Sequence, residues 1–79
     1  MISNKVFVDV IVKHNKDGNM QPLSIIWEDG VQYEIDRVID VRRAASLKAG
    51  GQGIRYTCFI EGKRSYLFYE SPKWFMERI

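Results

Sequence analysis

Cysteine and histidine are nearly absent from this chain of 79 residues, which contains one of each. A single cysteine excludes a disulfide within the chain. Zinc sites are built from several Cys and His ligands, so His14 and Cys58 alone give no metal-binding pattern. We expect His14 to be a solvated residue at a strand end. We expect Cys58 to be a buried thiol, because it lies in an apolar strand pattern and burial disfavours a reactive thiolate.

Long apolar runs are also missing. The valines at positions 6, 8, 10 and 12 alternate with other residues, whereas a signal peptide or a membrane span needs a continuous apolar stretch. We therefore expect no leader, no membrane span and a cytoplasmic location.

The chain has little excess of charge of either sign, since 12 Lys and Arg stand against 10 Asp and Glu. The distribution is uneven, however. Residues 1–40 carry 4 basic and 7 acidic side chains, a net −3, and residues 41–79 carry 8 basic and 3 acidic side chains, a net +5. A basic half of this kind points to an anionic partner.

Aromatic and β-branched residues that alternate with polar ones are abundant, and this period of two is typical of strands. The pattern predicts strands at 5–14, 22–27 with Pro22 as the first residue, 31–42, 54–61, 64–70 and 74–79. A dense turn cluster fills 15–19. Residues 44–49 are too few for a stable helix, and with the glycines at 50, 51 and 53 they predict a mobile loop.

The clearest hairpin signal is the stretch 25–41, IIWEDGVQYEIDRVIDV. A two-residue loop would mix apolar and polar residues on both faces. A three-residue loop at 28–30 instead pairs Trp27 with Val31, Ile25 with Tyr33 and Leu23 with Ile35, which gives one clean apolar face. Such loops need a left-handed residue at the third position, where Gly30 stands.

Two further features shape the later strands. Arg37 falls in an apolar slot and Val38 in a polar one, so a bulge near Asp36-Arg37 is expected to restore the phase and bend the strand. A second hairpin is expected with Gly62-Lys63 as its turn. Its register is then Glu61 with Arg64, Phe59 with Tyr66, Thr57 with Phe68 and Arg55 with Glu70.

These elements predict one all-β domain over residues 1–79, a small and strongly bent antiparallel barrel of five to six short strands. The expected core consists of Val8, Val10, Ile25, Trp27, Tyr33, Ile35, Cys58, Ile60 and Leu67. The run W-x-D-G-x-x-Y-x-I at 27–35, with L-F-Y at 67–69 and W-F at 74–75, resembles small bacterial β domains shaped like SH3 barrels. That resemblance implies a fold and no activity.

No catalytic constellation can be assembled from these residues, so we expect a protein that is not an enzyme and has no cofactor. Glu28 and Asp29 are adjacent in the sequence, and neighbouring residues on a strand point to opposite faces, so neither they nor Asp36 and Asp40, which the expected bend separates, form a catalytic pair. The loop 48–53 is glycine-rich but lacks the P-loop pattern. It is either a passive connector or a contact loop.

Two binding surfaces are candidates. Basic residues interleaved with an aromatic ring are what single-strand or backbone binding uses, and we expect a nucleic-acid patch at one barrel end that consists of Arg42, Arg43, Lys48, Arg55, Lys73 and Trp74. The alternative is a protein-interaction or self-association module. It uses a free sheet edge or an exposed aromatic face formed by Phe59, Tyr66 and Phe68.

Overall fold

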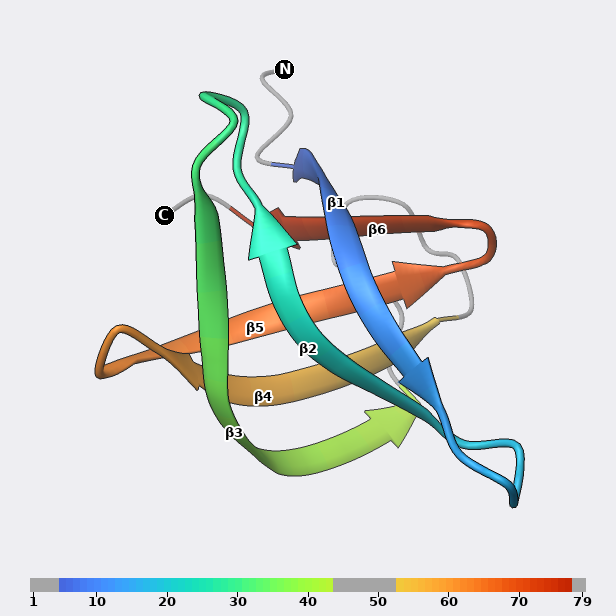
Figure 1. The fold of residues 1–79 in the computed structure, drawn as a ribbon. Coiled ribbons are helices and arrows are strands. Elements are labelled where there is room, and N and C mark those ends of the chain that lie inside the picture. The colour runs from blue at the N-terminus through green and yellow to red at the C-terminus, as the bar shows by residue number, and fades with distance from the viewer. Residues whose placement is uncertain (1–4, 44–52, 78–79) are drawn as a thin grey trace.

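The computed structural model describes residues 5–43 and 53–77. In these ranges the chain forms strands and no helix, and the six strands are β1 (Lys5–His14), β2 (Met20–Ile26), β3 (Gln32–Arg43), β4 (Ile54–Ile60), β5 (Lys63–Glu70) and β6 (Lys73–Glu77). Each strand pairs antiparallel with the next along the chain, and β6 pairs with β1 to close a barrel (Figure 1). The predicted all-β barrel is confirmed. No helix long and apolar enough to span a membrane occurs in the described ranges.

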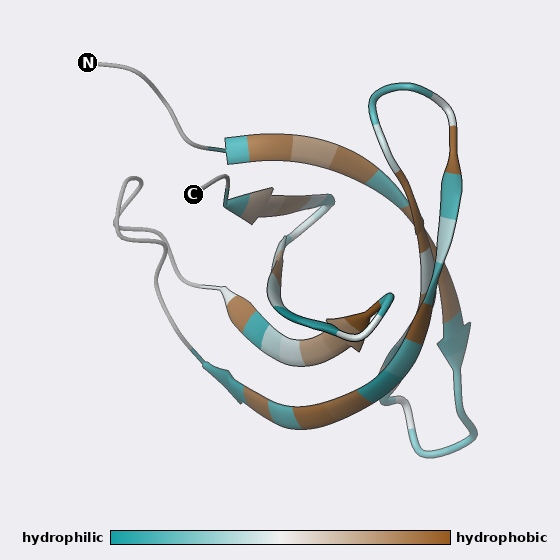
Figure 2. Ribbon diagram, turned by 90° about the vertical axis from the view of Figure 1, so that its left-hand side faces the viewer, coloured by the Kyte–Doolittle hydropathy of each residue, from teal (hydrophilic) through white to brown (hydrophobic). Residues whose placement is uncertain are grey.

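The alternation in β1 works as predicted. Val6 and Val8 are buried, Val10 and Val12 are partly buried, and the residues between them face solvent. Figure 2 shows hydrophobic and hydrophilic segments alternating along the strands. The turn that follows is held by the Asn15 side chain, whose Oδ1 accepts hydrogen bonds of 3.0 Å from two backbone N–H groups downstream.

The β2–β3 hairpin has the predicted three-residue loop. Ile25 pairs with Tyr33, Trp27 N donates to Val31 O at 2.9 Å, and Gly30 N donates to Trp27 O at 2.9 Å. Gly30 has φ +85°, the left-handed conformation that this loop requires.

The start of β2 differs from the prediction. The strand begins at Met20, so Pro22 is not its first residue. Opposite β1, Ile11 pairs with Ser24 and Val12 with Pro22, which leaves Leu23 as the extra residue of a bulge. Leu23 is therefore 39% exposed and does not share the core face with Ile25. A bulge turns one side chain out of phase, and nothing in the alternation marks it.

The expected bend of β3 is confirmed, and Figure 1 shows the strand curving around the barrel. Ile35 pairs with Ile60 and Arg37 with Phe59, so Asp36 is bulged, as predicted. This bulge turns Arg37 outward. A second bulge, which the sequence did not predict, leaves Ile39 unpaired and 47% exposed.

The predicted register of the β4–β5 hairpin is wrong. Ile60 pairs with Lys63, so the turn is Glu61-Gly62 and not Gly62-Lys63. Both turn residues have positive φ, +50° for Glu61 and +74° for Gly62, which is the type I′ geometry preferred in two-residue hairpins. The resulting register brings Arg64 opposite Phe59, Tyr66 opposite Thr57 and Phe68 opposite Arg55.

The last hairpin turns at Ser71-Pro72, as expected, with a cis peptide bond and with Glu70 opposite Lys73. Strand β6 then pairs with β5 on one side and with residues 5–8 of β1 on the other. The sheet thus has no terminal strand among the described elements.

All nine predicted core residues belong to the apolar cluster inside the barrel. Five are buried, and four are partly buried against them, namely Val10, Trp27, Tyr33 and Ile35. A second buried group lies on the outer face: Phe75 is 0% and Phe68 is 6% exposed. Their rings stack at 5.0 Å, and Phe7 meets Phe75 edge-on at 5.8 Å.

Candidate nucleic-acid interface

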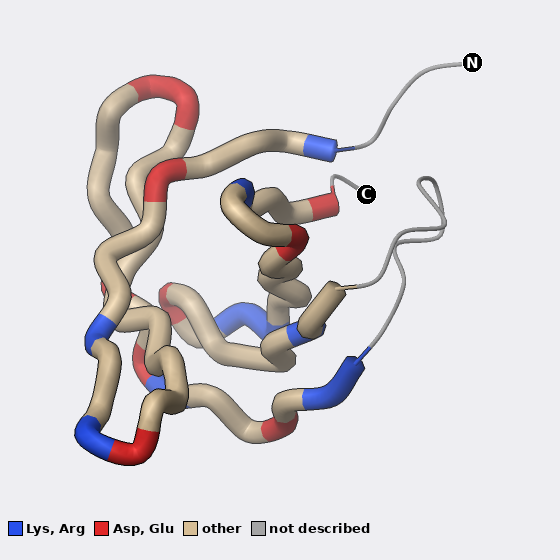
Figure 3. Tube along the Cα trace, turned by 90° about the vertical axis from the view of Figure 1, so that its right-hand side faces the viewer, with Lys and Arg blue, Asp and Glu red and all other residues tan. Residues whose placement is uncertain are grey.

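Arginine and aromatic side chains gather on the outer face of three neighbouring strands. Cross-strand partners share a face of a sheet, and the pairs Arg37 with Phe59, Arg42 with Arg55 and Phe59 with Arg64 therefore lie on one side. We call this surface the arginine face; it consists of Arg37, Arg42, Arg55, Arg64, Phe59 and Tyr66. Figure 3 shows basic segments on these adjacent strands, away from the acidic tip of the β2–β3 hairpin.

The guanidinium groups lie over aromatic rings. The Cζ of Arg55 is 4.8 Å and the Cζ of Arg64 is 5.9 Å from the centre of the Tyr66 ring. The Cζ of Arg37 is 5.0 Å from the centre of the Phe59 ring. These are cation–π distances. Because stacking restricts long side chains, the cations are held in place before any ligand arrives.

The exposure of the rings decides which of them a ligand can reach. Tyr66 is 43% exposed, Phe59 is partly buried, and Phe68 is buried. Of the three rings in the candidate protein-interaction face, Tyr66 thus offers the largest free surface. Phe68 instead packs on Phe75 in the buried cluster of the outer face.

Asp40 is the acidic member of this surface. Arg42 holds it with two contacts, Nε to Oδ2 at 2.8 Å and Nη2 to Oδ1 at 3.3 Å. The hydrogen bond from Arg42 lowers the pKa of Asp40, and the same bond raises the pKa of Arg42. Asp40 therefore remains ionised and offsets part of the charge of Arg42. The other three arginines of the face make no ion pair with the residues that the structure describes.

The six residues of the predicted patch fall into separate places. Arg42 and Arg55 are cross-strand partners on the arginine face, and Arg43 is exposed beside them at the end of β3. Lys48 lies outside the described residues, as does the loop 44–52. Lys73 lies over Phe7, with Nζ 5.5 Å from the ring centre.

Trp74 points into the barrel. Its ring centre lies 4.7 Å from that of Tyr69 and 5.5 Å from that of Tyr56, and it packs against the core. Together with Lys73 it lines a pocket of about 430 Å³ where β1 leaves β6. These two residues therefore form a site distinct from the arginine face.

Sequence reasoning missed Arg37 and Arg64. The expected register placed Arg64 at a strand tip far from Arg55, whereas the observed register puts Tyr66 opposite Thr57, where both arginines reach its ring. The signal that could have revealed this is the preference of two-residue hairpins for turns with two left-handed residues ending in glycine, which fits Glu61-Gly62.

The described residues offer no arrangement for metal chemistry: among 5–43 and 53–77, no three His, Cys, Asp or Glu side chains are grouped to hold a metal ion. His14 is exposed at the end of β1. Cys58 is 0% exposed, and burial raises its thiol pKa from 9.0 to about 11. The thiol is therefore protonated at neutral pH and is not a nucleophile there.

Comparison of the chain with protein-family models, with curated proteins and with solved structures finds no match. The function is therefore inferred from the side chains themselves.

Proposed function

We propose that the protein is a non-catalytic binding module whose arginine face contacts the backbone and bases of single-stranded nucleic acid. One observation carries the proposal: Tyr66 is 43% exposed, and the guanidinium carbons of Arg55 and Arg64 lie 4.8 Å and 5.9 Å from its ring centre. A base that displaces one guanidinium group and stacks on this ring has both cations within reach of its phosphates. Aromatic platforms flanked by cations are the common means of binding single strands.

A single strand fits this surface better than a duplex does. The bases of a duplex are stacked on one another and cannot lie on Tyr66. A duplex reader also needs an element that enters a groove, usually a helix or a ribbon, and the described strands form a closed barrel. Base identity contributes little to stacking, so we expect slight sequence preference.

The arginine face predicts a moderate salt dependence. It has four arginines, one of which is paired with Asp40. Contact with four phosphates of a single strand gives a slope of log K against log[salt] of roughly −3. Binding is then weak at physiological salt and easily measured at low salt.

The test is fluorescence anisotropy of labelled single- and double-stranded oligonucleotides at low salt. Replacing Tyr66 by Ala is expected to weaken single-strand binding by roughly 1–3 kcal/mol through loss of stacking. The double variant Arg42→Glu/Arg64→Glu, with both exposed residues on the arginine face, is expected to weaken it further and to flatten the salt slope. Lys13→Glu/Lys16→Glu, with both residues exposed at or beside the β1–β2 turn, is the charge-matched control and should bind like the parent.

Two results would overturn the proposal. One is a parent protein that shows no binding at high micromolar concentration. The other is a Tyr66→Ala variant that binds as tightly as the parent, which would make the surface an ordinary charged one.

A second candidate function is docking of a protein, including a second copy of this chain. Ile39 and Val41 on β3 are 47% and 54% exposed, which leaves apolar surface of this strand uncovered. Size-exclusion chromatography over a concentration series separates self-association from a free surface. A mass that stays monomeric, together with oligonucleotide binding, favours the first function.

Two broader inferences accompany this proposal. The bent β3 and the sequence of hairpins support placing the barrel in the SH3-like class. A buried, unpaired thiol fits a reducing compartment, which supports a cytoplasmic location.

A further inference from the structure

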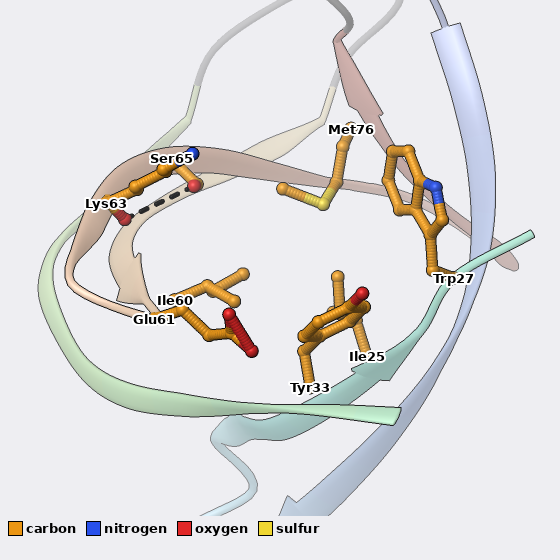
Figure 4. A pocket seen from close by; sticks show the side chains of 8 residues that line it. All are labelled: Ile25, Trp27, Tyr33, Ile60, Glu61, Lys63, Ser65 and Met76. Carbon is orange, nitrogen blue, oxygen red and sulfur yellow. Dashed lines mark hydrogen bonds between the residues drawn. The ribbon is translucent and has the colours of Figure 1, made fainter. Parts of the chain in front are cut away.

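The barrel has a pocket at one mouth that is separate from the arginine face. It has a volume of about 400 Å³ and lies between the β2–β3 and β4–β5 turns. This volume is within the range of small-molecule sites, about 300–1,000 Å³. Five of the six described strands and their turns line it (Figure 4).

Two polar residues of the pocket occupy inward positions of the barrel. Ser65 pairs with Cys58 and Lys63 with Ile60, and both partners belong to the core, so the two polar residues share the inner face. The Ser65 hydroxyl donates to the Lys63 carbonyl oxygen at 3.3 Å. The Lys63 ammonium forms no ion pair with residues 5–43 or 53–77. Lys63 is exposed at the mouth of the pocket, so its ammonium group is open to an anionic group of a ligand.

Glu61 brings a charge of the opposite sign to the same rim. Its φ of +50° is uncommon for a residue other than glycine, asparagine or aspartate. Strained residues of this kind concentrate at binding sites. In Figure 4 its carboxylate points across the pocket toward Tyr33.

The opposite side of the pocket is apolar. Ile25 and Ile60 are buried beneath it, and Trp27, Tyr33 and Met76 are partly buried around it. Figure 4 shows the charged rim residues on one side and Trp27, Tyr33 and Met76 on the other. The pocket therefore has a charged end that carries both signs and an apolar, largely aromatic end.

We propose that this pocket binds a small zwitterion with an apolar side group, of the class of free α-amino acids with an aromatic or long aliphatic side chain. Lys63 binds the carboxylate. Glu61 binds the ammonium group, and the Ser65 oxygen accepts a further hydrogen bond from it. The side group lies between Trp27, Tyr33 and Met76. A ligand with one charge is disfavoured, because it leaves either Lys63 or Glu61 without a partner and next to a like charge.

The test compares four ligands by titration of the full chain, followed by the backbone amide signals in two-dimensional NMR. Two ligands are the amino acids L-phenylalanine and L-leucine. The other two are 3-phenylpropanoate, which lacks the ammonium group, and phenethylamine, which lacks the carboxylate. We expect both amino acids to produce saturable shifts at 25–33 and 60–65. We expect loss of either charge to weaken binding by at least about fivefold, the effect of one charge-assisted hydrogen bond.

Two variants assign the charges. Lys63→Met is expected to weaken L-phenylalanine binding by about five- to tenfold. In this variant L-phenylalanine then binds no more tightly than phenethylamine. Glu61→Gln is expected instead to remove the higher affinity of L-phenylalanine over 3-phenylpropanoate. Lys16→Met, at the β1–β2 turn, is the control and should bind like the parent.

The proposal fails if neither amino acid gives saturable shifts up to about 20 mM, which is weaker than any useful small-molecule site. It also fails if 3-phenylpropanoate or phenethylamine binds the parent as tightly as L-phenylalanine does. Neither result bears on the proposed nucleic-acid binding by the arginine face, because Tyr66 and its arginines are not part of this pocket.

Discussion

Among the residues that the structure describes, Glu61 is the one other than glycine that has a positive φ. The type I′ turn requires positive φ at both central positions, and Asn-Gly is the preferred pair. Glu61 occupies the first of them at +50°. A carboxylate is therefore kept at the barrel mouth although a smaller residue would suit the turn better.

Replacing Glu61 by Asn is expected to raise the free energy of unfolding by about 0.5–1 kcal/mol, because asparagine tolerates the left-handed conformation. Urea denaturation measures the change. Glu61→Gln keeps a long side chain at the same φ and should leave stability almost unaltered. A less stable Glu61→Asn protein would show that the turn is assigned wrongly.

The buried thiol of Cys58 is expected to make the stability of the fold depend on pH. Burial raises its pKa to about 11 in the folded protein from the 9.0 of an exposed thiol. Below about pH 9 the thiol is protonated in both states and stability is unaffected. Between these values the unfolded chain loses the proton and the folded chain does not, so stability falls as the pH rises toward 11.

Urea titrations at pH 8 and pH 10.5 test this expectation. The parent is expected to lose more stability over that interval than Cys58→Ala, which has no thiol to ionise. Tyr56 contributes to the alkaline loss in both proteins, because burial raises its pKa as well. Equal losses in the two proteins would contradict the assigned burial of Cys58.

At the scale of elements, the β2–β3 hairpin depends on Gly30. A Cβ at this position would meet nothing within 4 Å, so space is not the constraint. The constraint is φ +85°. Gly30→Ala is expected to cost about 1–2 kcal/mol of stability, and Gly30→Asn roughly half as much, since asparagine visits this region. Thermal unfolding of the two variants checks the order, and an alanine variant as stable as the parent would refute it.

The two hairpins show which features of a sheet a sequence can determine. In the β2–β3 hairpin the alternative loops differed by one residue of register, and such a slip turns every side chain to the other face. The apolar pattern therefore excluded one of them. In the β4–β5 hairpin the expected and observed registers differ by two residues, so the same side chains face inward in both. Burial patterns cannot distinguish the two, and the turn preference that could do so was applied to the wrong residue pair.

The same limit affected the candidate site. Because the faces were right, Arg55, Phe59 and Tyr66 were expected on one side of the sheet, and they lie there. Because the register was wrong, Arg64 was expected far from Arg55, and the meeting of both arginines at Tyr66 was not foreseen. Arg37 became part of this surface through the bulge at Asp36, which was predicted, but its contact with Phe59 depends on pairing between β3 and β4. Nothing local in the sequence specifies that pairing.

The whole molecule is stabilised from both sides of its sheet. The barrel interior contains the predicted cluster, and the outer face has a second cluster around Phe75, which is 0% exposed. The Nζ of Lys5 lies 4.4 Å from the centre of the Phe75 ring and forms a 3.5 Å ion pair with Glu70. The last strand is therefore anchored by contacts on both of its faces.

Phe75→Ala is expected to cost about 3–5 kcal/mol, close to the full stability of so small a domain. Phe75→Leu retains most of the buried volume and is expected to stay folded with a smaller loss, which makes the effect measurable by urea denaturation. A leucine variant that unfolds in water, or an alanine variant as stable as the parent, would show that the outer cluster is described wrongly.

The pairing of β1 with β6 sets an order of events in folding. Five of the six strand pairs join neighbours along the chain, whereas this one joins residues 5–8 to residues 74–77. Closing so long a loop is entropically the most demanding step, and it gains most once the hairpins have already shortened the chain. We therefore expect the barrel to close last. Val8, which faces Trp74 across this seam, then controls how fast the native protein opens and has little influence on how fast it forms.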